Sequence, residues 1–371
     1  EWYPSGMPPA SKPRKQARRT NPRGLLARAM GDEQPTPDTL ARLVQAALGF
    51  DALQPWNRLQ DGDVIVYDGI EPPRCYCSVM GAAGQSFGLQ AFEGPGGLAA
   101  MNMVRRSGEA AADNMALFFE QNCSLVAEIV DPGDLDPLDR AVLAGARFSP
   151  SKRRVPQFAA MRPGQMRFVP TDKEAGRLAD CLEAVNWMCS HGQGTLASDP
   201  WADGKNPLVR ADSGGGYRVE VVPEDQPPRL ASPPKFTAAD RKRMAQMPHL
   251  PAGVELDCFF FGAIGSVLGR KTAGLLALLT DEAGFVVANE AGAIGQEGVA
   301  TVADLLHNAL MEGIGAMGGI PARIIMRTPE LAEQVGALAQ ALGSEVWVSP
   351  KLPGLDPARD ALLSAVQQRL Q

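Results

Sequence analysis

Apolar and polar positions alternate most clearly in the C-terminal third of the chain. Short apolar segments bounded by turn residues predict strands, and apolar positions three or four residues apart predict helices. The strands are expected at Val254–Phe261, Gly274–Thr280, Phe285–Asn289, Arg323–Met326 and Glu345–Val348, and the helices at Val302–Met311, Pro329–Leu342 and Asp356–Leu370. This β-β-β-α-β-α-β-α order predicts a mixed sheet covered by helices.

The preceding part of the chain has a less regular pattern, typical of an α+β domain. Strands are expected at Asp63–Asp68, Cys75–Gly81, Ser86–Glu93, Gln157–Met161, Met166–Pro170 and Tyr217–Val222, with another ending near Ile129–Val130. Helices are expected from Thr36 or Asp38 to Leu48, at Leu98–Arg106, at Asp134–Ala144 and from Thr171 to about Ser190. Both parts together place the chain in the α/β class.

Two helices carry recognisable signals at their ends. Thr171 is followed at the third position by Glu174, which is the pattern of a capping box. Thr328 precedes a proline and is expected to cap the next helix, which Gly343 should end. These signals predict helix boundaries independently of the apolar pattern.

Composition changes along the chain and divides it into four parts. Residues 1–36 are rich in proline and basic residues and predict a poorly ordered or extended arm. An N-terminal domain is expected over 37–222 and a C-terminal domain over 237–371. The proline-rich stretch 223–236 between them is expected to be a linker, and the C-terminal domain to fold by itself.

The composition excludes several classes of protein. Six cysteines in 371 residues are too few for a disulfide scaffold, and they are expected to be reduced thiols. Three histidines and the absence of a CxxC motif argue against a zinc site. There is no G-x-S-x-G motif and no phosphate-binding loop of the usual spacing, so neither a metal nor a cofactor is expected.

The same composition favours a soluble protein of the cytoplasm. The net charge of −6 suits solubility and argues against a dominant nucleic-acid surface. The most apolar window, Cys258–Thr280, holds Arg270 and Lys271 at its middle, where a charge is costly in a bilayer. We therefore expect this window to form two core strands and expect no membrane association.

The element order of the C-terminal domain resembles that of ribonuclease-H-like domains. Nucleases of that fold use several carboxylates to hold two Mg²⁺ ions. The candidates here are Asp257, Asp304 and Asp360, on the first strand, the first helix and the last helix. The fourth strand ends at Arg327 and Thr328, with no carboxylate and with a cation that would repel the metals. The sequence therefore predicts no divalent-metal nuclease activity.

Basic residues outside this domain are the candidates for contact with nucleic acid. They are Arg18 and Arg19 in the arm and the cluster Lys152, Arg153 and Arg154. Few aromatic residues lie among them, which gives little support for stacking on bases.

Two segments resemble domains of unknown function that occur together in bacterial proteins. The first is Cys75–Leu89, which contains YCSVMGAAGQSFGL and is followed by EGPGGL, and the second is Ile324–Leu355, which begins IIMRTPELAEQVGAL. The resemblance covers most of the chain after residue 40 and implies architecture, with no assigned reaction. The related C-terminal domains tend to carry an Asp where this chain has Thr328.

Three functions remain compatible with these patterns. The first is a non-catalytic binding or scaffolding protein with a protein partner. The second is a nucleic-acid-associated protein with a catalytically degenerate ribonuclease-H-like domain. The third is an enzyme of unrecognised type.

Overall fold

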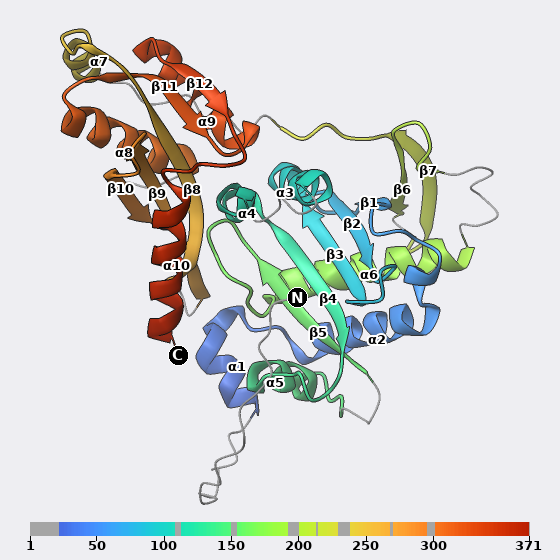
Figure 1. Cartoon of the computed structure of the whole chain (residues 1–371). Helices are drawn as coiled ribbons and strands as arrows, with labels where there is room; N and C mark the ends of the chain where they lie inside the picture. The colour runs from blue at the N-terminus through green and yellow to red at the C-terminus, as the bar shows by residue number, and fades with distance from the viewer. Residues whose placement is uncertain are drawn as a thin grey trace, which may run out of the picture.

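A computed structural model of the chain contains two sheets, each with helices packed on its faces (Figure 1). The structure describes residues 22–107, 113–149, 154–191, 200–212, 214–228, 238–267, 270–294 and 301–370. Within these ranges, no helix is long and apolar enough to cross a membrane.

The N-terminal sheet has seven strands in the order β5-β4-β3-β2-β1-β6-β7. They are β1 (Val64–Asp68), β2 (Cys75–Met80), β3 (Gly88–Glu93), β4 (Ser124–Val130), β5 (Val155–Met161), β6 (Lys205–Ala211) and β7 (Tyr217–Pro223). Only the pair β1–β6 is parallel, and the other neighbours are antiparallel. The strands expected at Asp63–Asp68, Cys75–Gly81 and Ser86–Glu93 are therefore present, as β1, β2 and β3.

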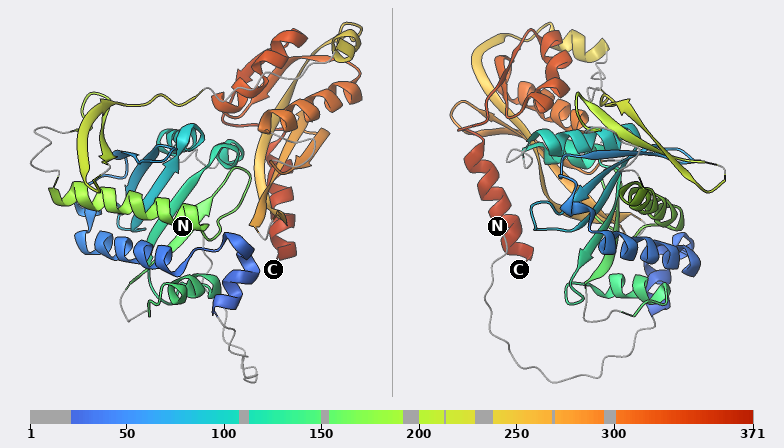
Figure 2. Two further views of the ribbon diagram at one scale, coloured as in Figure 1. Left: turned by 180° about the vertical axis from the view of Figure 1, so that it is seen from behind. Right: turned by 90° about the vertical axis from the view of Figure 1, so that its right-hand side faces the viewer.

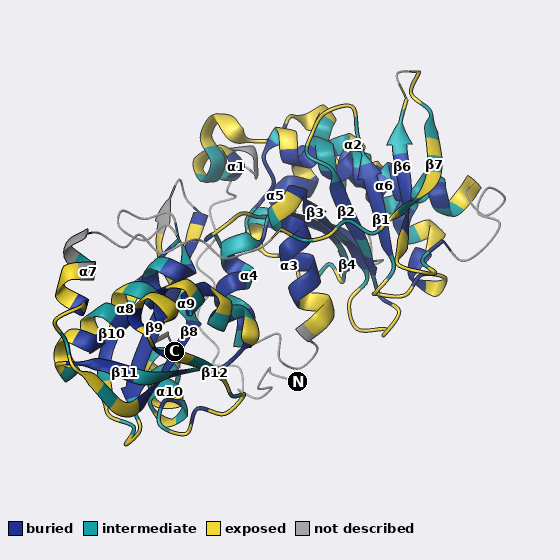
Figure 3. Ribbon diagram, turned by 90° about the horizontal axis from the view of Figure 1, so that it is seen from above, coloured by how far each residue is buried: buried dark blue, intermediate teal, exposed yellow. Residues whose placement is uncertain are grey.

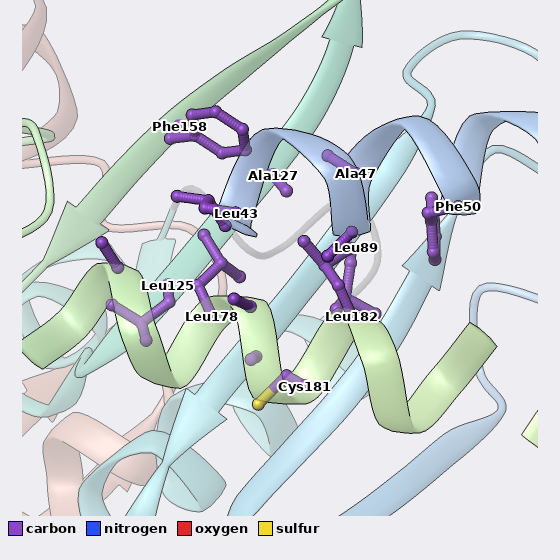
Figure 4. Close-up of a cluster of buried hydrophobic side chains, with 14 of the residues drawn as sticks. Leu43, Ala47, Phe50, Leu89, Leu125, Ala127, Phe158, Leu178, Cys181 and Leu182 are labelled. Atoms are coloured by element: carbon purple, nitrogen blue, oxygen red, sulfur yellow. The ribbon is translucent and has the colours of Figure 1, made fainter. Parts of the chain in front are cut away.

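Helices cover both faces of this sheet. One face carries α2 (Pro37–Leu53) and α6 (Asp172–His191), with α5 (Pro137–Gly145) nearby, and the other carries α3 (Gly94–Ser107) and α4 (Met115–Gln121). Helix α6 buries Leu178 and Leu182, four residues apart, and α2 buries Leu43 beside them (Figure 4). The apolar stripes of two helices thus close the main core of the domain.

Helix α3 begins at Gly94 instead of the expected Leu98. A side chain at Gly97 would lie 2.8 Å from the backbone of Cys123 and of Phe92, so only glycine allows this close approach. The glycine-rich EGPGGL segment therefore begins a helix whose first turn packs tightly against the backbone of Phe92 and Cys123.

The expectation of an extended arm over residues 1–36 is wrong for its last part. Helix α1 (Pro22–Met30) and the 3-10 turn Gly31–Glu33 occupy it, and Leu26 is only 3% exposed. The reason is tertiary packing: α1 lies against α5 in the main core, and the few apolar residues of the segment suffice for that. Residues 1–21 lie outside the described part.

The C-terminal sheet has five strands in the order β10-β9-β8-β11-β12. They are β8 (His249–Val267), β9 (Arg270–Asp281), β10 (Val286–Gly292), β11 (Ile320–Met326) and β12 (Glu345–Val348). Strands β8, β9 and β10 are antiparallel, whereas β8, β11 and β12 are parallel. The expected mixed sheet is confirmed, and the described residues of the apolar window, 258–267 and 270–280, belong to strands β8 and β9.

Helices lie on both faces of this sheet as well (Figure 2). One face carries α8 (Val302–Met317) and α9 (Pro329–Leu342), and the other carries α10 (Asp356–Leu370); α7 (Ala238–Met244) precedes the first strand. Thr328 caps α9, since its Oγ1 accepts from the Leu331 amide at 3.3 Å, and Gly343 ends it with a φ of 74°. Both predicted boundaries are confirmed.

The two sheets share a core. Four buried residues of α3 and α4 belong to the hydrophobic cluster of the C-terminal sheet, namely Ala99, Met103, Ala116 and Leu117. Figure 3 shows the buried residues concentrated on both sheets and on the helix faces that cover them. The C-terminal core is therefore completed by helices that precede the expected linker.

Backbone hydrogen bonds also join the two parts. The Met166 amide donates to the Lys271 carbonyl at 2.8 Å, and the Ala273 amide donates to the Gly164 carbonyl at 2.9 Å. The segment expected as a strand at 166–170 forms only an isolated bridge, between Ala160 and Phe168. The segment around residues 164–166 therefore contacts strand β9 of the C-terminal sheet through backbone hydrogen bonds.

We expect a pH-dependent stability from Glu120, which lies at this interface. Its Oε2 accepts from the Val302 amide at the start of α8 (3.1 Å), and burial raises the pKa of the carboxyl to about 7, with Asp304 adding to the rise. The Glu120 carboxyl thus has a higher pKa in the folded chain than in the unfolded chain. Its contribution to stability is fully present below the unfolded pKa and is lost as the pH rises through the folded pKa of about 7.

The variant Glu120→Gln should therefore gain stability relative to the wild type between about pH 4.5 and 7, by at most about 3 kcal/mol. Urea unfolding of both proteins at pH 5 and pH 8 measures the difference. Glu312→Gln, on the exposed side of α8, is the matched control and should show no such trend. An equal loss of stability at both pH values in Glu120→Gln would contradict the prediction.

Candidate functional site

Asp257 lies at the centre of the C-terminal sheet and is 1% exposed. Side chains alternate along β8, so Leu256 and Cys258 join the core under α8 and α9. Phe259 faces the opposite side, towards α10, and Asp257 shares that side with it. A carboxylate in this position needs a partner, since burial without one is costly.

Arg327, at the end of β11, supplies that partner. Its Nε donates to Asp257 Oδ2 at 2.7 Å, one Nη donates to Asp356 Oδ1 at 2.5 Å, and the other donates to the Pro350 carbonyl at 3.2 Å. The guanidinium is 4% exposed. Arg327 therefore joins the first strand of the sheet, the last helix and the loop before it.

Two further charged residues complete what we call the Arg327 cluster. Arg359 of α10 lies 3.7 Å from Asp257 Oδ2. Asp113, which precedes α4, lies 3.7 Å from Arg327 and 3.6 Å from Arg359. The cluster thus holds two guanidinium groups and three carboxylates and connects both domains.

The pKa values of Asp257 and Asp356 are shifted in opposite directions within the cluster. Burial raises the pKa of Asp257, and the two guanidinium groups oppose that rise. Burial alone would also raise the pKa of Asp356, but hydrogen bonds from Arg327 and the Leu352 amide together hold it below its ordinary value. The guanidinium groups of Arg327 and Arg359 therefore balance the charge of these carboxylates, as a metal ion would in a metal centre.

The structure does not bring the three catalytic candidates together. Asp304 accepts from the amide and the hydroxyl of Thr301, both at 3.0 Å, and so forms the capping box of α8 on the other face of the sheet. The Asp360 side chain is 71% exposed. Of the three, only Asp257 lies in a buried cluster, and the described residues contain no group of His, Cys, Asp and Glu side chains arranged for a metal.

The candidates for nucleic-acid contact are only partly described. Arg18, Arg19, Lys152 and Arg153 lie outside the described residues. The guanidinium of Arg154 stacks 4.7 Å from the centre of the Phe87 ring and lies 3.3 Å from Asp51. Arg154 is therefore already engaged within the N-terminal domain.

A second site, which the sequence did not indicate, is a pocket of about 550 Å³ in the N-terminal domain. One wall is the face of α6 that carries Lys173, Gly176, Arg177 and Asp180. The rest comes from α2, from the loop after β1 and from the turn between β6 and β7. Its volume is within the usual range for small-molecule sites.

Ion pairs hold most of the charged groups around this pocket. Arg42 of α2 contacts Asp180 at 2.5 Å and Glu183 at 2.7 Å. Arg177 donates to the buried Glu93 at 2.5 Å and to the Pro72 carbonyl at 3.0 Å. These pairs fix α6 against α2 and against the loop after β1.

Three buried thiols lie beneath the pocket. Cys75 and Cys77 share one face of β2, and both contact Cys181 of α6. Hydrogen bonding within the group and burial raise the pKa of Cys75 far above its ordinary value. Thiols of this kind are unreactive, so they contribute packing and not a nucleophile.

Two family models match parts of the chain. Residues 41–206 match a family described as a domain of unknown function, DUF7309, and residues 240–363 match a second, DUF6930. The resemblance to two paired domains of unknown function is thereby confirmed. No curated protein matches the chain.

Proposed function

We propose that this pair of domains forms a non-catalytic binding protein whose C-terminal half is a degenerate ribonuclease-H-like domain. The observation that carries the proposal is the Arg327 cluster. A buried guanidinium 2.7 Å from Asp257 neutralises the one carboxylate that lies where the first metal ligand of such a nuclease is expected. The sheet order supports the likeness, because the first three strands are antiparallel and the fourth pairs with the first in parallel.

A metal titration tests the absence of a metal centre. We expect Mg²⁺ and Mn²⁺ to leave the melting temperature unchanged, because a divalent cation beside Arg327 would be repelled. A bound metal at 100 times its dissociation constant would stabilise the fold by about 2.7 kcal/mol, which is easily detected. A rise of the melting temperature with Mn²⁺ that disappears in Asp257→Asn would argue for a metal site.

Association with nucleic acid is the second candidate. Its support is the sheet order of the C-terminal domain and the basic residues of the arm. Binding of a generic oligonucleotide should then weaken steeply with salt, in proportion to the phosphates contacted. The non-catalytic binding proposal expects no such binding at physiological ionic strength.

We also propose a bacterial protein of the cytoplasm. The cytoplasmic location is supported by the six cysteines, which are all free thiols although three of them lie together. The bacterial source is supported by the resemblance of the two sequence segments. A protein partner, expected from the sequence, stays a prediction.

A further inference from the structure

Four strands form the edges of the two sheets, and β7 is the least protected of them within the described residues. Edge strands avoid pairing with other chains when they are short, bulged or covered. The outer edge of β5 is bridged by Phe168, β10 carries a bulge between Val286 and Ala288, and β12 has only four residues. In contrast, β7 has seven residues in continuous register with β6, and Figure 3 shows it largely exposed at the margin of the N-terminal domain.

The backbone of β7 presents hydrogen-bonding groups on its outer side. Just before the strand, the Gly216 carbonyl accepts from the Asp212 amide at 3.0 Å, and just after it the Glu224 amide donates to the Gly204 carbonyl at 2.9 Å. Backbone groups alternate in direction along an antiparallel strand, so the even-numbered residues of β7 direct theirs towards β6. The outward groups belong to Tyr217, Val219 and Val221. No described strand pairs with them.

The two charged residues of β7, Arg218 and Glu220, have opposite signs, share one face of the strand and are both exposed. The Glu220 carboxylate lies 2.8 Å from Nε of Arg210 on β6. Arg218 lies directly opposite that same Arg210 in the strand register, where two like charges destabilise a sheet. Among the described residues no carboxylate lies within ion-pair distance of Arg218. Its side chain therefore lacks a partner of opposite charge within this part of the chain.

A second copy of the chain supplies that partner when two β7 strands pair antiparallel about a twofold axis at Val219. In this register the outward groups of Val219 meet those of Val219 in the second copy, and Tyr217 meets Val221. Arg218 then lies opposite Glu220 of the second copy, and it does so twice, in the pairs that bring side chains closest. Moving the axis to Arg218 or to Glu220 would place like charges directly opposite each other. The charges of β7 therefore select one register.

We propose that the chain forms a homodimer through β7, which joins the two seven-stranded N-terminal sheets into one continuous sheet. The contact is isologous, because the same strand edge faces itself across the twofold axis. Backbone hydrogen bonds between the two copies of β7 hold the seam together, and the paired Arg218 and Glu220 side chains fix its register. This inference goes beyond the proposed binding function, because it requires no ligand and leaves the Arg327 cluster unchanged.

The first test is analytical ultracentrifugation of the full chain over about 1–100 μM, which should show a monomer–dimer equilibrium. Arg218→Glu and Glu220→Arg should each raise the dissociation constant at least about ten-fold, because two attractive pairs across the seam become repulsive. Arg106→Glu, an exposed charge reversal on α3, is the matched control and should leave the constant unchanged. A wild type that stays monomeric over the whole range overturns the proposal, and so does a dimer that neither reversal in β7 weakens.

The second test mixes the Arg218→Glu and Glu220→Arg proteins, one of them carrying a fluorescent label. The first has two carboxylates on its β7 strand and the second has two guanidinium groups, so each repels itself and complements the other. We expect a heterodimer that is at least about ten-fold tighter than either homodimer. Misfolding of a variant cannot produce this recovery, so the result is specific to the seam. Absence of the heterodimer in the mixture would overturn the proposed register.

Discussion

Replacing Arg327 by methionine is expected to destabilise the folded chain by about 3–5 kcal/mol, because it leaves Asp257 charged and buried without its nearest partner. The methionine side chain fills a similar volume, so the loss measures the charge and not a cavity. Urea unfolding followed by circular dichroism gives the free energy. A loss below about 1 kcal/mol, the value of an exposed pair, would show that the cluster is not a buried ionic centre.

Two further variants make this result specific. Arg323→Met, on the same strand, removes an exposed pair with Glu282 and should cost less than about 1 kcal/mol. The double variant Asp257→Leu with Arg327→Met should recover most of the stability lost in Arg327→Met, because the buried carboxylate is removed together with its partner. Failure of the double variant to recover would place the loss in another contact of Arg327.

Replacing Leu117 by alanine is expected to cost about 2–5 kcal/mol, since this fully buried side chain of α4 fills the core of the C-terminal sheet. The effect should appear in the other domain: amide protons of β8 and α8 should exchange faster. Leu53→Ala, at the exposed end of α2, is the control and should change neither quantity appreciably. Unchanged exchange in β8 would mean that the two cores are independent.

Elements with strong local signals could be predicted from the sequence. Helix α9 has a capping threonine and a terminating glycine, Thr328 and Gly343, and both act as expected. The capping box at the start of α6 also forms, with the Thr171 amide and hydroxyl donating to Glu174 at 2.7 and 2.8 Å. Such signals depend only on residues three or four apart, so a single sequence reveals them.

Elements that depend on distant partners could not be predicted. Strand β6 contains Pro207, which argues against a strand inside a sheet, yet β6 pairs with β1 on one side and with β7 on the other. Helices α1 and α4 are short, and each is stabilised by a neighbour far along the chain. A local pattern carries no information about such neighbours.

The same limit applies to the sites. The presence of Arg327 where a nuclease would need a carboxylate was visible in the sequence, and it predicted the absence of a metal centre. Its partners Asp113 and Asp356 were not visible, because they come from a different domain and a later helix. The pocket on α6 is assembled from four segments of the chain, so no motif indicated it.

The most direct test of the account is a cleavage assay with the full chain, Mn²⁺ or Mg²⁺, and DNA, RNA or a hybrid duplex as substrate. Because Arg327 occupies the carboxylate centre around Asp257, we expect no cleavage above the level without metal. The variant Asp257→Asn serves as the control. Mn²⁺-dependent cleavage by the wild type that is lost in Asp257→Asn would contradict the account and establish an enzyme.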